Sequence, residues 1–216
     1  MIVAKFLLIS FLALTATKTI PDGFEKGGEV PVTIISRQKS VELFEEFRSH
    51  HEIPFDYPVE GCYSRATAMV RIAESQHIEM GKVFIQGELS VKTKSLNFGT
   101  VDWTYHVAPV LYVKDGASTK LMVFDPSLFD KPVTVDLWKN EMLKEKGTHL
   151  DRLFYSARYQ VRPDEDKKKY GWLPDDLQEA DSDLKIYSSV MRKIKSGSPL
   201  MYPTGFGIFE TGQGVK

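Results

Sequence analysis

The sequence contains one cysteine, Cys62, at a position that suits nucleophilic chemistry. It follows Gly61 and a segment that contains Pro54 and Pro58, and it begins a predicted helix over residues 62–77. The backbone N–H groups and the dipole at the start of a helix stabilise a thiolate, and one of those N–H groups can bind an oxyanion. Cys62 is therefore either a small core residue or a nucleophile, and its position favours the nucleophile.

A nucleophilic cysteine needs a base and a group that orients the base. His106 lies within an apolar predicted strand, residues 103–113, and Asp125 ends the next predicted strand, residues 120–125. A two-residue turn at Asp115-Gly116 would place His106 opposite Asp125, with their Cβ atoms about 4.5–5.5 Å apart. A longer loop would shift this register by one or two residues. The order Cys-His-Asp along the chain predicts a catalytic triad.

Other catalytic and binding motifs are missing from the sequence. It has no His-Glu-x-x-His zinc helix, no Gly-x-x-x-x-Gly-Lys phosphate loop and no Gly-x-Ser-x-Gly elbow. A single cysteine excludes both a thiolate zinc site and an intramolecular disulfide. The formal net charge is −1, which gives no overall basic field for nucleic acid. We expect no metal, no organic cofactor and no nucleic-acid partner.

The remaining sequence predicts one α+β domain, because no repeat and no linker divides it. Its 216 residues are 42% hydrophobic, enough to form a core of ordinary size. Strands are expected at Val30–Ile35, 82–86 and 153–161, and helices at 40–51 (capped by Ser40), 134–146 and 182–195. In this arrangement the helix that begins with Cys62 packs on an antiparallel sheet that carries His106 and Asp125.

The first residues predict export. Residues 1–16 combine Lys5, a short apolar run and small residues near Ala16, as a secretory signal peptide does. The run is shorter than the roughly 20 apolar residues that span a membrane. We expect a cut near Ala16, a secreted or periplasmic domain over residues 17–216, and no membrane attachment after cleavage. An unpaired cysteine in an oxidising compartment must be buried or used.

Three segments of the sequence occur in a characteristic order: PVEGCYSRA (residues 58–66), WTYHVA (residues 103–108) and DPSLF (residues 125–129). These segments resemble bacterial protein-glutaminases. Pro132-Val133 and Trp138 continue the likeness, so the motif core covers residues 55–138. The resemblance implies a transglutaminase/papain-like fold and hydrolysis of the side-chain amides of protein glutamines to glutamate, with release of ammonia.

The resemblance also assigns roles to residues. By matching position, the catalytic Cys, His and Asp of the family fall on Cys62, His106 and Asp125. Cys62 would form a thioester with the substrate, and the partners would be proteins or peptides that bear glutamine. Further candidates for substrate or oxyanion binding are Gly61, Trp103 and Tyr105.

Two features depart from the family pattern. Members of that family have disulfides, whereas this chain can form none. They also carry a long pro-region over the active site, whereas only a short segment lies between the expected cut and Cys62. Control by an inhibitor partner is an alternative to such a pro-region. The triad alone also leaves open a transglutaminase-like effector that modifies or binds one host protein, and a cysteine peptidase.

Overall fold

The computed structural model describes residues 16–94, 98–164 and 169–197. The strands in these ranges are β1 (Thr17–Pro21), β2 (Glu29–Ser36), β3 (Gly81–Lys92), β4 (Thr100–Asp115), β5 (Ser118–Val123), β6 (Val133–Thr134) and β7 (His149–Ala157). The helices are α1 (Arg37–Ser49), α2 (Cys62–Ser75), α3 (Val135–Met142) and α4 (Pro174–Lys195). The fold is α+β, as expected. The sequence analysis did not anticipate β1, and it expected α3 to be longer and α4 shorter.

The strands form a sheet in the order β1-β2-β4-β3-β7, with β5 added beside β4 and β6 beside β5. The two central strands, β3 and β4, are rich in buried aliphatic residues and pair over most of their length. Most pairs are antiparallel, but β2 runs parallel to β4 between Ile34 and Ser36. The sheet is therefore mixed at this one pair, where the sequence predicted antiparallel strands throughout.

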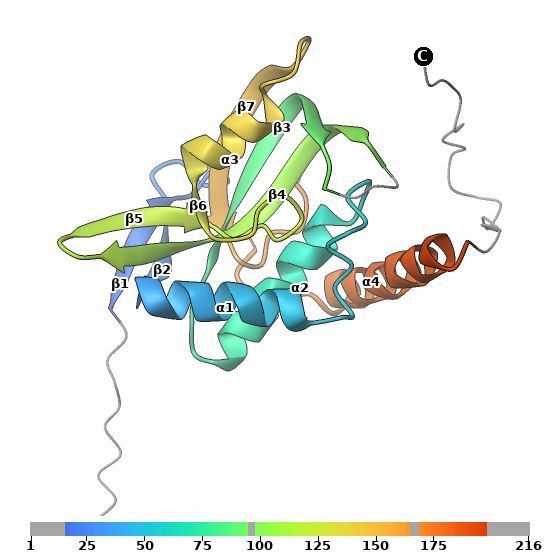
Figure 1. The fold of residues 1–216 in the computed structure, drawn as a ribbon. Coiled ribbons are helices and arrows are strands. Elements are labelled where there is room, and N and C mark those ends of the chain that lie inside the picture. Colours follow the sequence, from blue (N-terminus) through green and yellow to red (C-terminus); the bar gives the residue numbers. More distant parts are fainter. Residues whose placement is uncertain (1–15, 95–97, 165–168, 198–216) are drawn as a thin grey trace, which may run out of the picture.

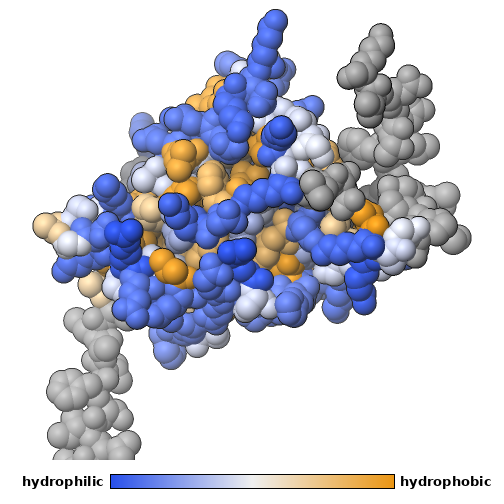
Figure 2. Space-filling view, in the orientation of Figure 1, coloured by the Kyte–Doolittle hydropathy of each residue, from blue (hydrophilic) through white to orange (hydrophobic). Residues whose placement is uncertain are grey.

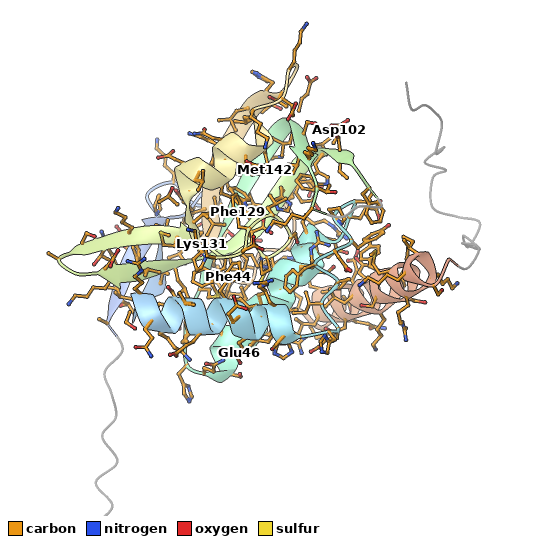
Figure 3. The ribbon with its side chains drawn as sticks, viewed as in Figure 1. Phe44, Glu46, Asp102, Phe129, Lys131 and Met142 are labelled. Atoms are coloured by element: carbon orange, nitrogen blue, oxygen red, sulfur yellow. The ribbon has the colours of Figure 1, made fainter. Side chains whose placement is uncertain are left out.

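The helices lie on the sheet and around its lower edge, as drawn in Figure 1: α1 crosses the front, and α4 lies beside α2. Leu43, Phe44 and Phe47 form the buried face of α1. Figure 3 shows Phe44 on the side of α1 toward the sheet and Glu46 on the opposite side. On the face shown in Figure 2, apolar residues gather in the centre between α3 and α1, and hydrophilic residues surround them.

The cap of α1 differs from the prediction. The oxygen of Ser36, not of Ser40, accepts the hydrogen bond from the Lys39 backbone N–H, at 3.1 Å. Ser40 is buried inside the helix and donates its hydroxyl to the Arg37 carbonyl. The helix starts one turn earlier than predicted because β2 runs into it without a loop, so the last residue of the strand serves as the cap.

The hairpin between β4 and β5 also differs from the prediction. Its two turn residues are Gly116 and Ala117, so Asp115 pairs with Ser118 and the register is displaced by two residues. A displacement of two keeps every side chain on its expected face. Paired residues of β5 end at Val123, and the chain then turns back, because the N–H groups of Leu128 and Phe129 both bond to the Asp125 carbonyl. Asp125 thus lies in a turn beyond the strand, not on it.

The predicted signal peptide falls almost entirely outside the described residues, which begin at Ala16. Among the helices that the structure does describe, none is long and apolar enough to cross a membrane.

Candidate active site

The candidate nucleophile is the first residue of α2, and a glycine of unusual conformation precedes it. Gly61 has φ +75°, in the left-handed region that glycine adopts without strain. A Cβ at this position would lie 2.5 Å from Cε2 of Tyr187, an aromatic residue of α4. Both the backbone angle and the approach of α4 therefore require glycine. Cys62 is partly exposed, and Gly61 has no side chain that could cap the first turn of the helix.

The candidate base and its candidate orienting group form a buried hydrogen bond. Nε2 of His106, on β4, lies 2.8 Å from Oδ2 of Asp125, and both side chains are almost wholly buried. Two further donors hold the carboxylate: the Trp138 indole N–H at 2.9 Å and the Ser127 backbone N–H at 3.2 Å. The turn that follows β5 brings Asp125 to His106. The strand pairing predicted from the sequence is not what joins them.

The second ring nitrogen of His106, Nδ1, is the one that can interact with Cys62. Nδ1 of His106 is buried and has no hydrogen-bond partner among the described residues. The thiol of Cys62 nevertheless lies close enough to raise the pKa of His106. Because Nε2 is bonded to Asp125, Nδ1 is the nitrogen that remains to exchange a proton with the Cys62 sulfur when the contact tightens in a substrate complex.

Two indole rings hold the imidazole. The His106 ring stacks on Trp103, with centroids 4.5 Å apart and planes 9° apart, and on Trp138, with centroids 5.6 Å apart and planes 26° apart. Trp103 is fixed in turn, because its indole N–H donates to the Pro58 carbonyl at 3.0 Å. These contacts, together with the bond to Asp125, leave the ring one orientation.

The charges of the site favour an ion pair between Cys62 and His106. Burial disfavours the charged form of each group, but the neighbouring charges and hydrogen bonds have a larger effect on the pKa. The pKa of His106 is raised to about 9, mainly by the negative charge and hydrogen bond of Asp125 and then by Cys62. Burial would raise the pKa of Cys62, yet His106 and then Arg65 lower it below its ordinary value. Burial opposes the charge of Asp125 too, and His106 and Trp138 lower its pKa.

Known proteins match the part of the chain that contains this site. The family model described as glutaminase matches residues 40–142, which include Cys62, His106 and Asp125. The crystal structure of a pro- protein-glutaminase is 26% identical and has a TM-score of 0.63, over 73% of this chain and 59% of that one. The chain is similar to protein-glutaminases in sequence and in fold.

Other structures of the family share the fold. A crystal structure of protein-glutaminase is 24% identical with a TM-score of 0.58, and the match covers 82% of this chain and 95% of that one. The NMR structure of protein-glutaminase from Chryseobacterium proteolyticum is 24% identical with a TM-score of 0.57, over 77% of this chain and 91% of that one. The chain spans less than two thirds of the pro-forms. No curated protein sequence matches it.

The other residues singled out from the sequence lie around Cys62, His106 and Asp125. Gly61 directly precedes Cys62, and Tyr105 packs with Cys62 against one small apolar cluster. Trp103 lines a groove of about 400 Å³ between β3, β4 and the segment before β7. Its hydrogen-bond acceptor, Pro58, lines a second groove of about 240 Å³. Trp103 therefore lies between two grooves that border the site.

Sequence reasoning missed two contributors to the site. The likeness to protein-glutaminases included Trp138, but its hydrogen bond to Asp125 joins residues that no local pattern connects. Arg65 stood out only as one letter of a motif, yet its side chain is 2% exposed beside Cys62. A signal for it was present: Arg65 lies four residues before Met69, on the apolar face of the helix, where a charged side chain is rare.

Proposed function

We propose that this protein is a protein-glutamine deamidase, with Cys62 as nucleophile, His106 as acid and base, and Asp125 as the group that orients His106. One observation carries the proposal: the buried bond between Nε2 of His106 and Asp125 leaves Nδ1 facing a cysteine at a helix N-terminus. The match to the glutaminase family model and the similarity to a pro- protein-glutaminase structure support the choice of reaction and substrate.

The first half of the reaction releases ammonia. The Cys62 sulfur attacks the carboxamide carbon of a protein glutamine, and the amide oxygen takes up the negative charge. The Cys62 backbone N–H, free of any side-chain cap, is placed to donate to that oxygen. The His106 imidazolium gives its proton to the amide nitrogen, and the C–N bond breaks. Ammonia departs, and a thioester remains on Cys62.

The second half regenerates the enzyme. Neutral His106 takes a proton from water, whose oxygen attacks the thioester carbon, and the C–S bond breaks to give glutamate and the Cys62 thiolate. Asp125 stays ionised throughout and stabilises the imidazolium of the resting state, since its pKa is lowered in the folded protein. The reaction uses groups of the chain and water, and we propose no cofactor for it.

Ammonia release from casein tests the proposal. The wild-type protein and Cys62→Ser are compared at equal concentration, and the substrate is then examined by mass spectrometry. We expect ammonia and conversion of glutamine to glutamate at intact peptide length, both abolished by the substitution. Shortened peptides would indicate a peptidase, and incorporation of a labelled amine would indicate a transglutaminase.

A binding protein would give a different result. If neither protein releases ammonia from casein or from other unfolded substrates, the chemistry proposed for Cys62 is wrong for general substrates. The effector that acts on or binds one host protein, or an enzyme held by an inhibitor partner, then becomes the better hypothesis. A pure binder would keep its affinity in Cys62→Ser.

We also propose that residues 1–16 are a signal peptide and that the protein acts outside the cytoplasm. A cut after Ala16 would leave β1 complete, because this strand begins at Thr17. N-terminal sequencing of protein recovered from the periplasm and the medium tests the cut. A protein that stays in the cytoplasm with Met1 in place would contradict it.

A further inference from the structure

Arg65 is a charged side chain that the fold has enclosed next to the nucleophile. It lies in the first turn of α2, three residues after Cys62, and is 2% exposed. Arginine is almost never fully buried unless its charge is paired, because removing a guanidinium from water costs several kcal/mol. Its burial here needs an explanation.

No carboxylate explains the burial. Nη1 of Arg65 donates to the carbonyls of Tyr57, at 2.8 Å, and Glu60, at 2.6 Å. Within the described ranges Arg65 forms no ion pair, and its Nη2 is buried without a hydrogen-bond partner. The two carbonyl bonds tie the segment that leads into Gly61 to the helix that follows it. No anion of the described residues forms an ion pair with the positive charge of Arg65.

The charge of Arg65 acts on the site. It lowers the pKa of both Cys62 and Asp125, and those two groups are the first of the negative charges that favour the guanidinium. Burial lowers the pKa of Arg65 itself, but a guanidinium stays protonated in proteins. A charge enclosed away from water acts more strongly on its neighbours than one at the surface.

We propose that Arg65 is a positioning residue that fixes the segment before Cys62 and stabilises the negative charge on the Cys62 sulfur. This inference depends on the proposed function only for the nature of the nucleophile. Two carbonyls could be satisfied by any buried donor, whereas a fixed positive charge beside the thiolate requires arginine or lysine. The proposal therefore separates the charge of Arg65 from its hydrogen bonds.

Other titratable groups face the thiol and must be held constant. His106 and Tyr105, from β4, both act on Cys62, and Asp125 acts through His106. From α4, Tyr187 packs on Gly61 and donates to Glu60. None of these groups is altered in the variants below.

The test measures the ionisation of Cys62 directly. The chain has one cysteine, so the rate of alkylation by iodoacetamide as a function of pH reports Cys62 alone. Arg65→Gln keeps a hydrogen-bond donor and removes the charge, Arg65→Met removes both, and Arg65→Lys keeps the charge. Arg71→Gln is the matched control, since Arg71 lies on the same helix with an exposed ion pair to Asp181.

We expect both neutral variants to raise the pKa of Cys62 by about 1 or more, the effect of losing a nearby opposite charge. Alkylation at a pH below both pKa values would then slow about tenfold for each pH unit by which the pKa rises. Arg65→Lys and Arg71→Gln are expected to keep the wild-type profile. Thermal unfolding followed by circular dichroism identifies the variants that fold.

Either neutral variant, folded and with an unchanged alkylation profile, would overturn the proposal. Failure of both neutral variants to fold would also overturn it, because Arg65 would then serve the fold alone. Alkylation needs no substrate, so this test is separate from that of the proposed function. A low pKa that depends on Arg65 in a protein that releases no ammonia would keep the inference and refute the deamidase.

Discussion

The N-termini of α1 and α2 are built in opposite ways. At α1 the Ser36 side chain accepts the N–H of Lys39, and the first helical residue, Arg37, is exposed with an ion pair to Asp115. At α2 the cap is Gly61, which has no side chain, and the first turn is largely buried. A side chain therefore caps the N-terminus of α1, whereas no side chain caps the N–H groups at the start of α2, beside the Cys62 thiol. The N-terminus of α2 is therefore the one that the proposed function assigns to the substrate.

The largest expected loss of activity comes from changing Asp125, the carboxylate bonded to His106 near the uncapped N-terminus of α2. Asp125→Asn removes the charge that keeps His106 protonated and should reduce ammonia release on the order of 10³- to 10⁴-fold. Asp130→Asn, an exposed carboxylate of the same turn region bonded to Lys94, is the control and should keep activity. Equal losses in the two variants would mean that the loop, and not the buried pair, limits the reaction.

Gly61, at the uncapped N-terminus of α2, gives the next largest expected effect. Gly61→Ala forces alanine into the left-handed region, at about 1–3 kcal/mol, and also drives a methyl group into the Tyr187 ring. Gly116→Ala has a similar φ, +60°, but nothing within 4 Å of its Cβ. Denaturant unfolding should therefore show a larger loss of unfolding free energy for Gly61→Ala, with slower alkylation of Cys62. Equal losses would show that α4 does not constrain Gly61.

The pH dependence of ammonia release sharpens the comparison. The reactive ion pair exists above the pKa of Cys62 and below that of His106. Because the pKa of Cys62 is lowered, activity should persist at pH values where an ordinary thiol is protonated. Because the pKa of His106 is raised to about 9, activity should fall about tenfold per pH unit above that value. A single rise near the ordinary thiol pKa would contradict the ion pair.

The smallest effect is expected at the capped end. Ser36→Ala removes the acceptor for the Lys39 N–H and should lower the free energy of unfolding by about 1 kcal/mol. Ammonia release and the alkylation profile of Cys62 should not change, since α1 contributes no group to the site. Chemical denaturation and the two assays at one temperature check this. A slower alkylation would show that the two helix ends are linked.

The sequence predicted the parts of the site that depend on local pattern, and it missed those that depend on long-range contacts. Cys62 at a helix start and His106 in an apolar strand follow from spacing, and the structure has both positions. The register of the hairpin was wrong by two residues, because Asp115-Gly116 and Gly116-Ala117 are both adequate turns in sequence. Asp125 reaches His106 through a turn that no periodicity predicts. The strand β1 was missed for a related reason, since its pairing with β2 leaves no local signal.

The stacking of His106 between the two indoles has a consequence for the order of events in the proposed reaction. An exposed side chain changes rotamer within nanoseconds, but a ring stacked on Trp103 and Trp138 and bonded to Asp125 cannot turn to present another nitrogen. Nδ1 must then give a proton to the departing ammonia and later take one from the entering water at the same place. Ammonia and water therefore occupy the same position beside Nδ1. Water can enter only after ammonia has left, so the two half-reactions must follow one another.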